Sequence, residues 1–362
     1  MEPRKEKLNK RILLWAGIAF LLIVALIALA YFLLFPPYEP LETTGAYSVT
    51  SEFFTFSDPN RIELYTDKGA ARRVNVEFWY PENVDGVFPL VIFSHGGLGI
   101  RSSNLSLYQE LASHGYVVGA LDHPYQAFWT RDDEGRLTLL DLGYLTDLQR
   151  EDAKTDKQQS LAYYQAWMQT RMGDINLVID TVLENANNGT PGVYSLVNTE
   201  MIGVMGHSLG GSAALGIGRQ RDDISGVIAL EAPFLYDVVD VDGDEFVFNN
   251  AAYPTPVLSI YSDDSWEMLS EWPQYALNDE LLANTPSRAF NVHISGVGHL
   301  GLTDLALSSP LLVRFLDRTP TTRGSTEVLR IINSISLKFF DAFLKGDGEF
   351  TWFQTDMNSL GP

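Results

Sequence analysis

The residue in this 362-residue chain most suited to chemistry is Ser208, at the centre of a Gly-x-Ser-x-Gly pentapeptide over residues 206–210. An apolar run over residues 201–205 precedes it, and a stretch of small residues over 212–218 follows. A strand, a tight turn and a helix in this order form a nucleophile elbow, which exposes a serine hydroxyl at the carboxyl end of a buried strand. The two glycines are expected to relieve crowding at the turn, since glycine has no Cβ atom. The alternative is a glycine-rich structural turn without chemistry.

A serine hydroxyl becomes an effective nucleophile when a base takes its proton and a third group orients that base. The chain has six histidines, and we predict that His299 is the base. It lies in a glycine-rich loop directly after a strand predicted over residues 290–294. This position matches the order serine, acid, histidine along the chains of α/β-hydrolases.

The acid has two candidate positions. Glu231 ends a strand predicted over residues 226–230, where nothing structural calls for a carboxylate beside a buried apolar run. Asp263 and Asp264 follow a strand predicted over residues 257–261, a place where many hydrolases carry the acid. These two aspartates are equally compatible with a polar loop or a helix cap.

Charge that develops on a carbonyl oxygen must be met by backbone N–H donors. Leu209, which follows the serine, is predicted to supply the first donor. The second is expected from the loop over residues 94–99, with the sequence Ser-His-Gly-Gly-Leu-Gly, which is similar to the HGGG-type loops of esterases. An ordinary glycine turn is the alternative reading of this loop.

Strands and helices alternate through most of the chain. Buried strands are predicted at residues 90–93, 116–121, 201–205, 227–230, 257–261 and 290–294, and helices at 105–114, 160–185, 212–219 and 325–344. An earlier strand over 73–79 has the period of two that is typical of an edge or hairpin strand. The alternation predicts an α/β fold of the α/β-hydrolase kind, with a mostly parallel central sheet and helices on both faces.

One segment interrupts this alternation. Residues 126–159 are polar, charged and aromatic. An insertion of this kind is expected at the carboxyl ends of the strands, where substrates bind in α/β sheets. It is either a lid over the site or a long surface excursion.

The amino terminus predicts a membrane anchor. Residues 12–35 form an uncharged apolar run of 24 residues, long enough to cross a bilayer as a helix. A basic tail over residues 1–11 precedes the run, so the amino terminus is expected in the cytoplasm and the rest outside. A cleaved signal peptide ending at residues 28–30 (Ala-Leu-Ala) is the alternative. We therefore expect a stalk over residues 36–51 and a hydrolase domain over 52–362.

The charge of the chain limits its partners. Residues 1–11 hold five of the 25 Lys and Arg and two of the 46 Asp and Glu, which leaves a net charge of −24 on the remainder. Such a domain is repelled by nucleic acid and by anionic lipid surfaces. The chain has no cysteine, which excludes a thiol nucleophile and disulfides. No cofactor or metal motif occurs in it, so no cofactor is expected.

Taken together, the motifs resemble those of the platelet-activating factor acetylhydrolase family of α/β-hydrolases. The likeness covers roughly residues 88–305 and is carried by residues 93–99, 111–118, 206–211 and 299–304. It implies that the acid is Glu231, where the family usually has aspartate. It also implies that the second oxyanion donor is Gly97, where the family has a larger residue. Bacterial polyester and dienelactone hydrolases are more distantly similar and would place the acid at Asp264.

These features predict a membrane-anchored serine hydrolase that cleaves carboxylic esters. Ser208, His299 and Glu231 are its expected triad, and Gly97 and Leu209 its expected oxyanion hole. The resemblance implies short-chain or oxidised phospholipid esters as substrates. Two alternatives stay open: a non-catalytic cell-surface binding protein on the same fold, and an acyltransferase that uses the same triad.

Overall fold

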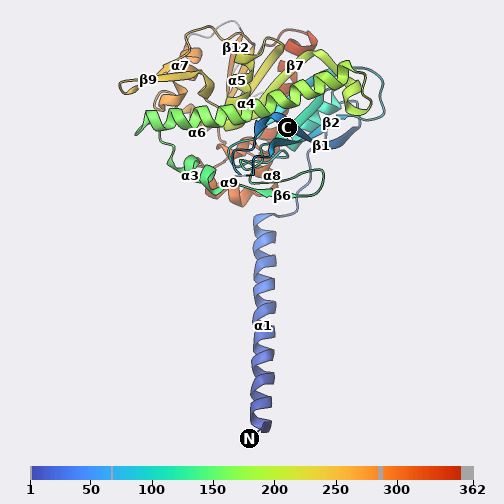
Figure 1. The fold of residues 1–362 in the computed structure, drawn as a ribbon, viewed down its shortest axis with the longest axis vertical. Helices are drawn as coiled ribbons and strands as arrows, with labels where there is room; N and C mark the ends of the chain where they lie inside the picture. The colour runs from blue at the N-terminus through green and yellow to red at the C-terminus, as the bar shows by residue number, and fades with distance from the viewer. Residues whose placement is uncertain (1, 67, 284–287, 352–362) are drawn as a thin grey trace.

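A long amino-terminal helix stands away from an α/β domain in the computed structural model of the chain (Figure 1). The structure describes residues 2–66, 68–283 and 288–351. Met1 of the predicted basic tail and residues 352–362 of the predicted hydrolase domain lie outside the described residues.

The domain is built on an eight-stranded sheet. In sheet order its strands are β1 (Val49–Ile62), β2 (Ala71–Pro81), β4 (Val117–Asp122), β3 (Phe88–Ser94), β7 (Val197–His207), β8 (Ile224–Leu230), β11 (Val257–Tyr261) and β12 (Ala289–His293). Strands β4 to β12 pair in parallel, whereas β2 is antiparallel to both of its neighbours. The predicted α/β-hydrolase fold with a mostly parallel sheet is therefore confirmed.

Helices cover both faces of the sheet because its central strands are apolar on both faces. Within β3, Leu90 and Ile92 pack into one core, and Val91 and Phe93 pack into the other. The first core is closed by α4 (Lys157–Asn187) and α5 (Leu209–Gln220), and the second by α2 (Leu105–Ser113) and α10 (Ser325–Phe340). Helix α4 runs across the whole front of the sheet in Figure 1.

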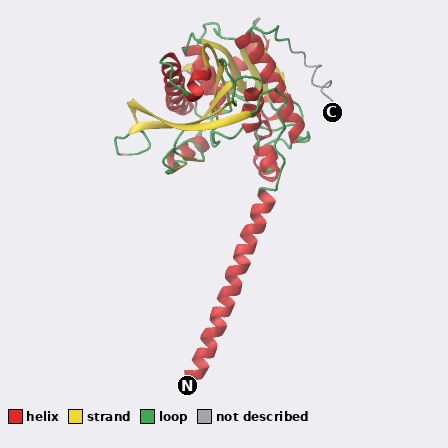
Figure 2. Ribbon diagram, turned by 90° about the vertical axis from the view of Figure 1, so that its right-hand side faces the viewer, coloured by secondary structure: helices red, strands yellow, loops and turns green. Residues whose placement is uncertain are grey.

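The remaining elements are short. They are α6 (Asp263–Trp266), α7 (Ala276–Ala283), α8 (Leu305–Ser308), α9 (Pro310–Leu316), the hairpin of β9 (Val238–Asp242) and β10 (Glu245–Phe248), four 3-10 turns (Gly192–Leu196, Leu235–Asp237, Pro273–Tyr275, Leu300–Leu302) and a π-helical turn (Asp341–Lys345). Loops and short helices gather at the side of the domain from which the long helix leaves (Figure 2).

The first strand was not predicted. The triplet Asp-Pro-Asn at residues 58–60 is typical of a turn, yet these residues belong to β1, whose pairing with β2 shifts between Asp58 and Ile62. Strand β1 is the edge strand of the sheet, where proline is tolerated. The strand predicted over 73–79 is thus the inner member of a hairpin and not an edge.

The predicted stalk over residues 36–51 is only partly a spacer. From Thr44 onward the segment lies on α2, with Thr44 N donating to Glu110 Oε2 at 2.9 Å and Tyr47 N donating to Ser113 O at 3.0 Å. Strand β1 begins at Val49, inside the predicted stalk. Residues 44–51 therefore pack on the domain, because the backbone N–H groups of Thr44 and Tyr47 bond to α2 in place of water.

The insertion over residues 126–159 has its own secondary structure. It contains a small hairpin of β5 (Trp129–Arg131) and β6 (Leu137–Leu139), then α3 (Leu142–Arg150), and it ends in the first turn of α4. In Figure 1, α3 and β6 lie at the edge of the domain nearest the long helix.

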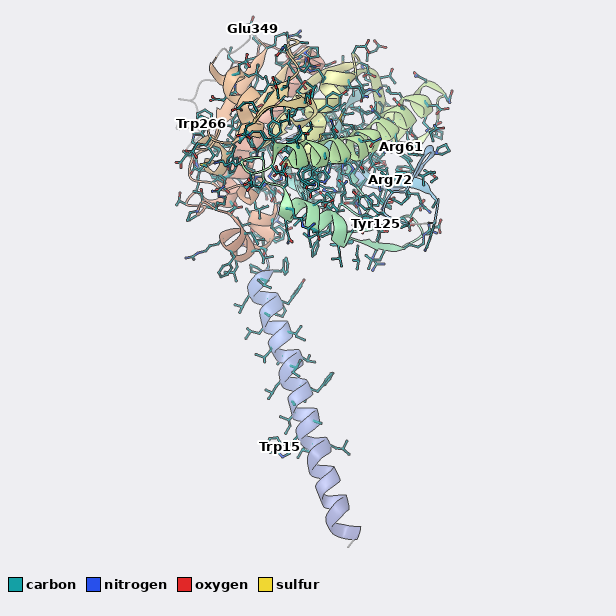
Figure 3. All side chains as sticks on the ribbon, turned by 60° about the vertical axis from the view of Figure 1, so that its left-hand side comes forward. Trp15, Arg61, Arg72, Tyr125, Trp266 and Glu349 are labelled. Atoms are coloured by element: carbon teal, nitrogen blue, oxygen red, sulfur yellow. The ribbon has the colours of Figure 1, made fainter. Side chains whose placement is uncertain are left out.

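The long helix α1 (Glu2–Leu34) includes an apolar stretch, Leu13–Leu34, of 22 residues with a mean hydropathy of 2.9 and none of it buried. By length and composition this stretch could cross a membrane, although a signal sequence has the same properties. The side chain of Trp15 projects from the helix far from the domain (Figure 3). The helix ends against the start of α9, where the Ser309 hydroxyl donates to the carbonyl of Leu34.

Candidate active site

The backbone at Ser208 is that of a sharp elbow. Ser208 joins β7 to α5 with φ 53° and ψ −127°, a conformation that costs a non-glycine residue energy. Its N–H donates to the carbonyl of Leu230 on the neighbouring strand at 2.7 Å. Sequence analysis predicted a strand, a turn and a helix here, and the structure contains all three.

Both glycines of the elbow are required by close backbone contacts. A Cβ atom on Gly210 would lie 2.0 Å from the carbonyl oxygen of Ser94, and one on Gly206 would lie 2.4 Å from backbone atoms of Gly210. Neither contact is possible for a real side chain. The crowding expected from the sequence is thus present, and it also presses the elbow against the loop that begins at Ser94.

Glu231 is placed beside His299. It directly follows β8 with φ 54°, so it shares with Ser208 a positive φ that only four described non-glycine residues have. Its side chain is buried and accepts hydrogen bonds from Ser262 N at 2.5 Å and Ser262 Oγ at 2.9 Å. Its Oε1 lies 3.8 Å from His299 Nδ1, within ion-pair distance.

The two aspartates have other partners. Asp264 accepts from the backbone N–H of Thr319 at 2.7 Å and from that of His299 at 3.1 Å. Asp263 lies 2.7 Å from His293 Nε2 and accepts from Gly296 N at 2.8 Å. Both carboxylates therefore hold the loop that carries His299, whereas the carboxylate of Glu231 faces the imidazole of His299 itself.

A pocket of about 440 Å³ brings the predicted site residues together. It is lined by Ser208, Leu209, Glu231, His299 and Gly97, with Asp264 also in its wall. Apolar side chains complete the lining, among them Leu148, Trp167, Trp272 and Leu316. The catalytic roles of these residues remain predictions, but all five lie on one cavity at the carboxyl end of the sheet.

Two opposing effects act on the His299 imidazole. Burial lowers its pKa, but the neighbouring carboxylate of Glu231, 3.8 Å away, raises it more, and the charges of Asp317 and Asp264 add to the rise. The net result is a pKa above the ordinary value of 6.5. His207, whose ring centroid lies 4.5 Å from that of His299, has its pKa lowered well below the ordinary value by burial and by the His299 charge.

This shift predicts the acid side of the pH profile. His299 accepts a proton only when neutral, so kcat/KM for ester hydrolysis is expected to fall as the pH drops through a midpoint above 6.5. In Glu231→Gln the remaining influence of burial should move the midpoint of the residual activity to lower pH. Steady-state rates between pH 5 and 9 measure both. An unchanged midpoint in the variant would contradict the coupling between Glu231 and His299.

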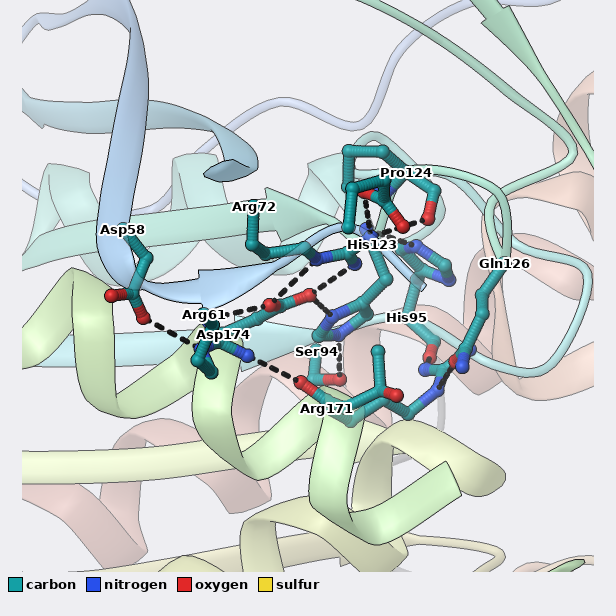
Figure 4. A network of polar contacts seen from close by, with 12 residues as sticks. Asp58, Arg61, Arg72, Ser94, His95, His123, Pro124, Gln126, Arg171 and Asp174 are labelled. Carbon is teal, nitrogen blue, oxygen red and sulfur yellow. Dashed lines mark hydrogen bonds and ion pairs between the residues drawn. The ribbon is translucent and has the colours of Figure 1, made fainter. Parts of the chain in front are cut away.

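A buried arginine holds the loop that carries Gly97. Arg171, on the inner face of α4, is completely buried, and its guanidinium donates to the carbonyls of His95 at 2.5 Å and Gly96 at 3.3 Å (Figure 4). It also donates to Gln126 Oε1 at 2.8 Å and to the Tyr144 hydroxyl at 3.3 Å.

Because the peptide unit is planar, the contact with Arg171 also fixes the direction of the Gly97 N–H. The carbonyl of Gly96 and the N–H of Gly97 belong to one trans peptide unit and point in opposite directions. Because Arg171 binds that carbonyl, the Gly97 N–H points away from the guanidinium, and Gly97 itself lines the pocket. Tyr144 of the insertion donates to the carbonyl of Gly97 at 2.8 Å and holds the next peptide in the same manner.

The insertion also occupies the space beside Gly97. A Cβ atom there would lie 3.5 Å from Leu148 Cδ1 and 3.6 Å from the Tyr144 hydroxyl. These are ordinary van der Waals distances, so α3 lies in contact with the position at which a side chain on residue 97 would begin.

Sequence reasoning missed Arg171 and Tyr144. One signal was available for Arg171: Met168 and Ile175, three residues before and four after it, are buried on α4, so Arg171 falls on the apolar face of the helix. A buried charge is costly unless hydrogen-bonded, which marks such a position for a specific role.

Removing the guanidinium is expected to disturb the oxyanion donor. We expect Arg171→Met to lower kcat for p-nitrophenyl acetate by about 10²-fold, near the loss of one oxyanion donor, with a smaller change in KM. Tyr144→Phe, which keeps its shape, should lose less. Arg221→Met is the matched control, since Arg221 pairs with Asp180 and Asp223, away from the loop. A folded Arg171→Met enzyme with unchanged kcat would refute the role.

A second serine–histidine–aspartate arrangement lies beneath this loop. His123 Nε2 lies 2.8 Å from Ser94 Oγ, and His123 Nδ1 lies 2.9 Å from Asp174 Oδ2 (Figure 4). All three side chains are fully buried, and Asp174 is also paired with Arg72 at 2.6 Å. Burial and the Arg171 charge lower the pKa of His123 to about 3, so it is neutral. With no exposure to substrate, this group supports the end of β3 structurally.

The part of the chain that the structure describes contains no group of three or more His, Asp or Glu side chains placed to hold a metal ion. The pocket of Ser208 is lined by polar and ionisable groups together with apolar walls.

Comparisons with known proteins show which family the chain resembles. A family model described as platelet-activating factor acetylhydrolase, isoform II, matches residues 64–362. The platelet-activating factor acetylhydrolase of Gallus gallus is 22% identical over 299 residues, which are 76% of this chain and 66% of that protein. A cutinase of Thermobifida fusca (strain YX) is 23% identical over 235 residues, 64% of this chain and 63% of that one. The chain therefore spans slightly less than two thirds of the length of these relatives.

A solved structure supports the fold. The ferulic acid esterase from Streptomyces cinnamoneus superposes with a TM-score of 0.66 and 20% sequence identity, covering 86% of this chain and 94% of that chain. The family match covers most of the chain, including every predicted site residue. The chain belongs to the platelet-activating factor acetylhydrolase, isoform II, family, as its motifs predicted.

Proposed function

We propose that this protein is a serine hydrolase that cleaves carboxylic esters. One observation carries the proposal: the strained elbow at Ser208 opens on the same pocket as His299 and Glu231. Strained backbone concentrates at functional sites, and here two of the three proposed triad members have it. Family membership and the ester-cleaving relatives add support.

The proposed reaction gives each of these side chains one role. Ser208 Oγ attacks the acyl carbonyl while His299 Nε2 takes the hydroxyl proton, and Glu231 beside Nδ1 stabilises the imidazolium. The N–H groups of Leu209 and Gly97 bind the oxyanion. His299 then gives the proton to the leaving alcohol, which departs and leaves an acyl-enzyme. Water, deprotonated by His299, releases the acid and restores Ser208.

We propose that the pocket takes short acyl chains. Its volume of about 440 Å³ is near the lower end of the range for small-molecule sites. Apolar walls such as Trp167 and Leu148 suit hydrocarbon, and no described cation beyond Arg318 lines it. Acetyl and other short-chain or oxidised phospholipid esters are therefore the proposed substrates, in line with the name of the Gallus gallus relative.

We also propose that α1 is a single membrane span that keeps the amino terminus in the cytoplasm and the catalytic domain outside. Its apolar stretch of 22 residues would extend about 33 Å, close to the thickness of a hydrocarbon core. Sodium carbonate extraction of membranes tests this. An anchored protein stays in the pellet with its amino terminus intact, whereas a cleaved signal peptide would give a soluble product that begins after residue 30.

A covalent probe tests the chemistry directly. A fluorophosphonate is expected to label the purified protein once, and mass spectrometry of the digest should place the adduct on Ser208. p-Nitrophenyl esters from acetate to dodecanoate would then define the chain-length preference. A binding protein without activity would take no label. An acyltransferase would form new esters when an alcohol acceptor is added.

A further inference from the structure

We propose that an apolar surface beside α1 docks the catalytic domain on the bilayer that holds the helix, so that the pocket receives its ester from the membrane. The surface consists of Phe128, Leu139 and Leu142 of the insertion and Phe315 of α9, and is called the docking surface below. This inference rests on the proposed ester hydrolysis and on the proposed membrane span, and it adds the source of the substrate.

The docking surface is unusually exposed for its composition. Leu142 and Phe315 are each 74% exposed, and Phe128 is 61% exposed. Leu139 is 59% exposed and lines, with Phe128 and Leu142, an apolar groove of about 640 Å³. Large apolar side chains gathered on one face of a soluble domain mark a contact with a partner or a membrane.

The end of α1 determines where the docking surface lies relative to the membrane. Leu34 is the last residue of the apolar stretch, so it would lie at the outer boundary of the hydrocarbon core. The carbonyl of Leu34 accepts a hydrogen bond from Ser309, and α9 begins at the next residue. Its seven residues extend only about 10 Å, so Phe315 is held close to the same level.

The insertion lies on the same side of the domain. Figure 1 shows α3, β6 and α9 together at the edge from which α1 leaves. The pocket confirms this proximity, because Leu148 of α3 and Leu316 of α9 both line it. The docking surface thus has two parts, one on the insertion and one on α9, on either side of the pocket.

The docking surface leads into the pocket. Leu145 lines the apolar groove, and Leu148, three residues later on the same helix face, lines the catalytic pocket. On the other side, exposed Phe315 is followed by Leu316 of the pocket wall. An acyl chain could therefore pass from the bilayer to Ser208 along apolar side chains.

The negative charge of the chain indicates which lipid headgroups the docking surface would meet. The chain after residue 11 has a net charge of −24, which disfavours anionic lipid. Contact is then made by apolar burial, as for proteins that lie at the membrane interface. The proposed occupant of the docking surface is accordingly a zwitterionic lipid surface such as phosphatidylcholine.

Spin labels measure the contact without relying on activity. The chain has no cysteine, so Leu139→Cys, Phe315→Cys and the control Val87→Cys each give one labelling site. Val87 is 58% exposed and precedes β3, at the opposite end of that strand from the pocket. In phosphatidylcholine nanodiscs holding the full chain, labels at 139 and 315 are expected to favour collision with oxygen over a water-soluble nickel complex. The label at 87 should show the reverse.

Equal nickel accessibility at all three positions would overturn the proposal. Spin–spin broadening would also overturn it if the broadening persists when unlabelled lipid is added but disappears on dilution with unlabelled protein. The docking surface would then contact a second copy of the chain.

Kinetics separate the docking surface from the chemistry. The triple variant Leu139→Ser, Leu142→Ser, Phe315→Ser is expected to lose at least about ten-fold in rate on a phospholipid ester in phosphatidylcholine vesicles. It should keep the wild-type rate on soluble p-nitrophenyl acetate, as should the control Val87→Ser on both substrates. Equal rates on vesicles, or equal loss on both substrates, would refute docking. Absence of p-nitrophenyl acetate hydrolysis in the wild type would refute the proposed function instead and leave the spin-label result to stand.

Discussion

Ser208→Ala is expected to reduce ester hydrolysis by about 10⁶-fold, because the variant has no group that can form the acyl-enzyme. What remains should come from the oxyanion donors alone, Leu209 and Gly97, which can still polarise a bound carbonyl. Alanine tolerates the elbow no worse than serine does at φ 53°. The variant should therefore fold, and its residual rate should be measured with p-nitrophenyl acetate after removal of trace wild-type enzyme.

Ser195→Ala is the matched control for this experiment. Ser195 is exposed, its hydroxyl donates to the Gly192 carbonyl, and it precedes β7, at the far end of that strand from the elbow. The control should keep full activity and full labelling by a fluorophosphonate. Substantial turnover by a folded Ser208→Ala enzyme would refute the mechanism.

Glu231→Gln is expected to lower kcat by about 10⁴-fold, the loss seen when an orienting carboxylate becomes an amide. The amide can still accept from Ser262, so the position stays hydrogen-bonded. It carries no charge to stabilise the imidazolium of His299, and it can hold the wrong tautomer. Steady-state kinetics with a soluble ester give the loss in kcat, which should far exceed any change in KM.

Asp264→Asn is the informative comparison. The carboxylate of Asp264 accepts from the backbone of Thr319 and His299, so its loss should loosen the loop and cost about ten-fold or less. If Asp264→Asn were inactive and Glu231→Gln active, the orienting role would belong to Asp264. The same pair of variants would then match the pattern of the more distant hydrolases.

Local signals made most of the fold and the elbow predictable. Strand β11 was predicted to the residue, and the elbow could be predicted because its strand, turn and helix are consecutive in the chain. Strand β1 was missed because its Asp-Pro-Asn triplet has the composition of a turn, and only pairing with β2 makes it a strand. The attachment of Thr44 to α2 was missed for a similar reason, since its partner lies 66 residues away.

The parts of the site that were not predicted depend on distant contacts. Arg171 meets His95 across 76 residues and Gln126 across 45, and no local pattern specifies such partners. The two candidate acids, Glu231 and Asp264, were difficult to separate for the same reason. Both lie shortly after neighbouring strands, β8 and β11, and their hydrogen-bond partners, Ser262 for Glu231 and the backbone of Thr319 for Asp264, are fixed by the fold and not by a local pattern.

The buried Ser94, His123 and Asp174 have a consequence for how hydrolases are recognised. Their hydroxyl–imidazole and imidazole–carboxylate separations, 2.8 and 2.9 Å, are tighter than the 3.8 Å between His299 and Glu231. A template search that ranks triads by distance alone would choose this decoy over the pocket at Ser208. Solvent access and backbone strain tell the two apart, and neither is part of a distance template.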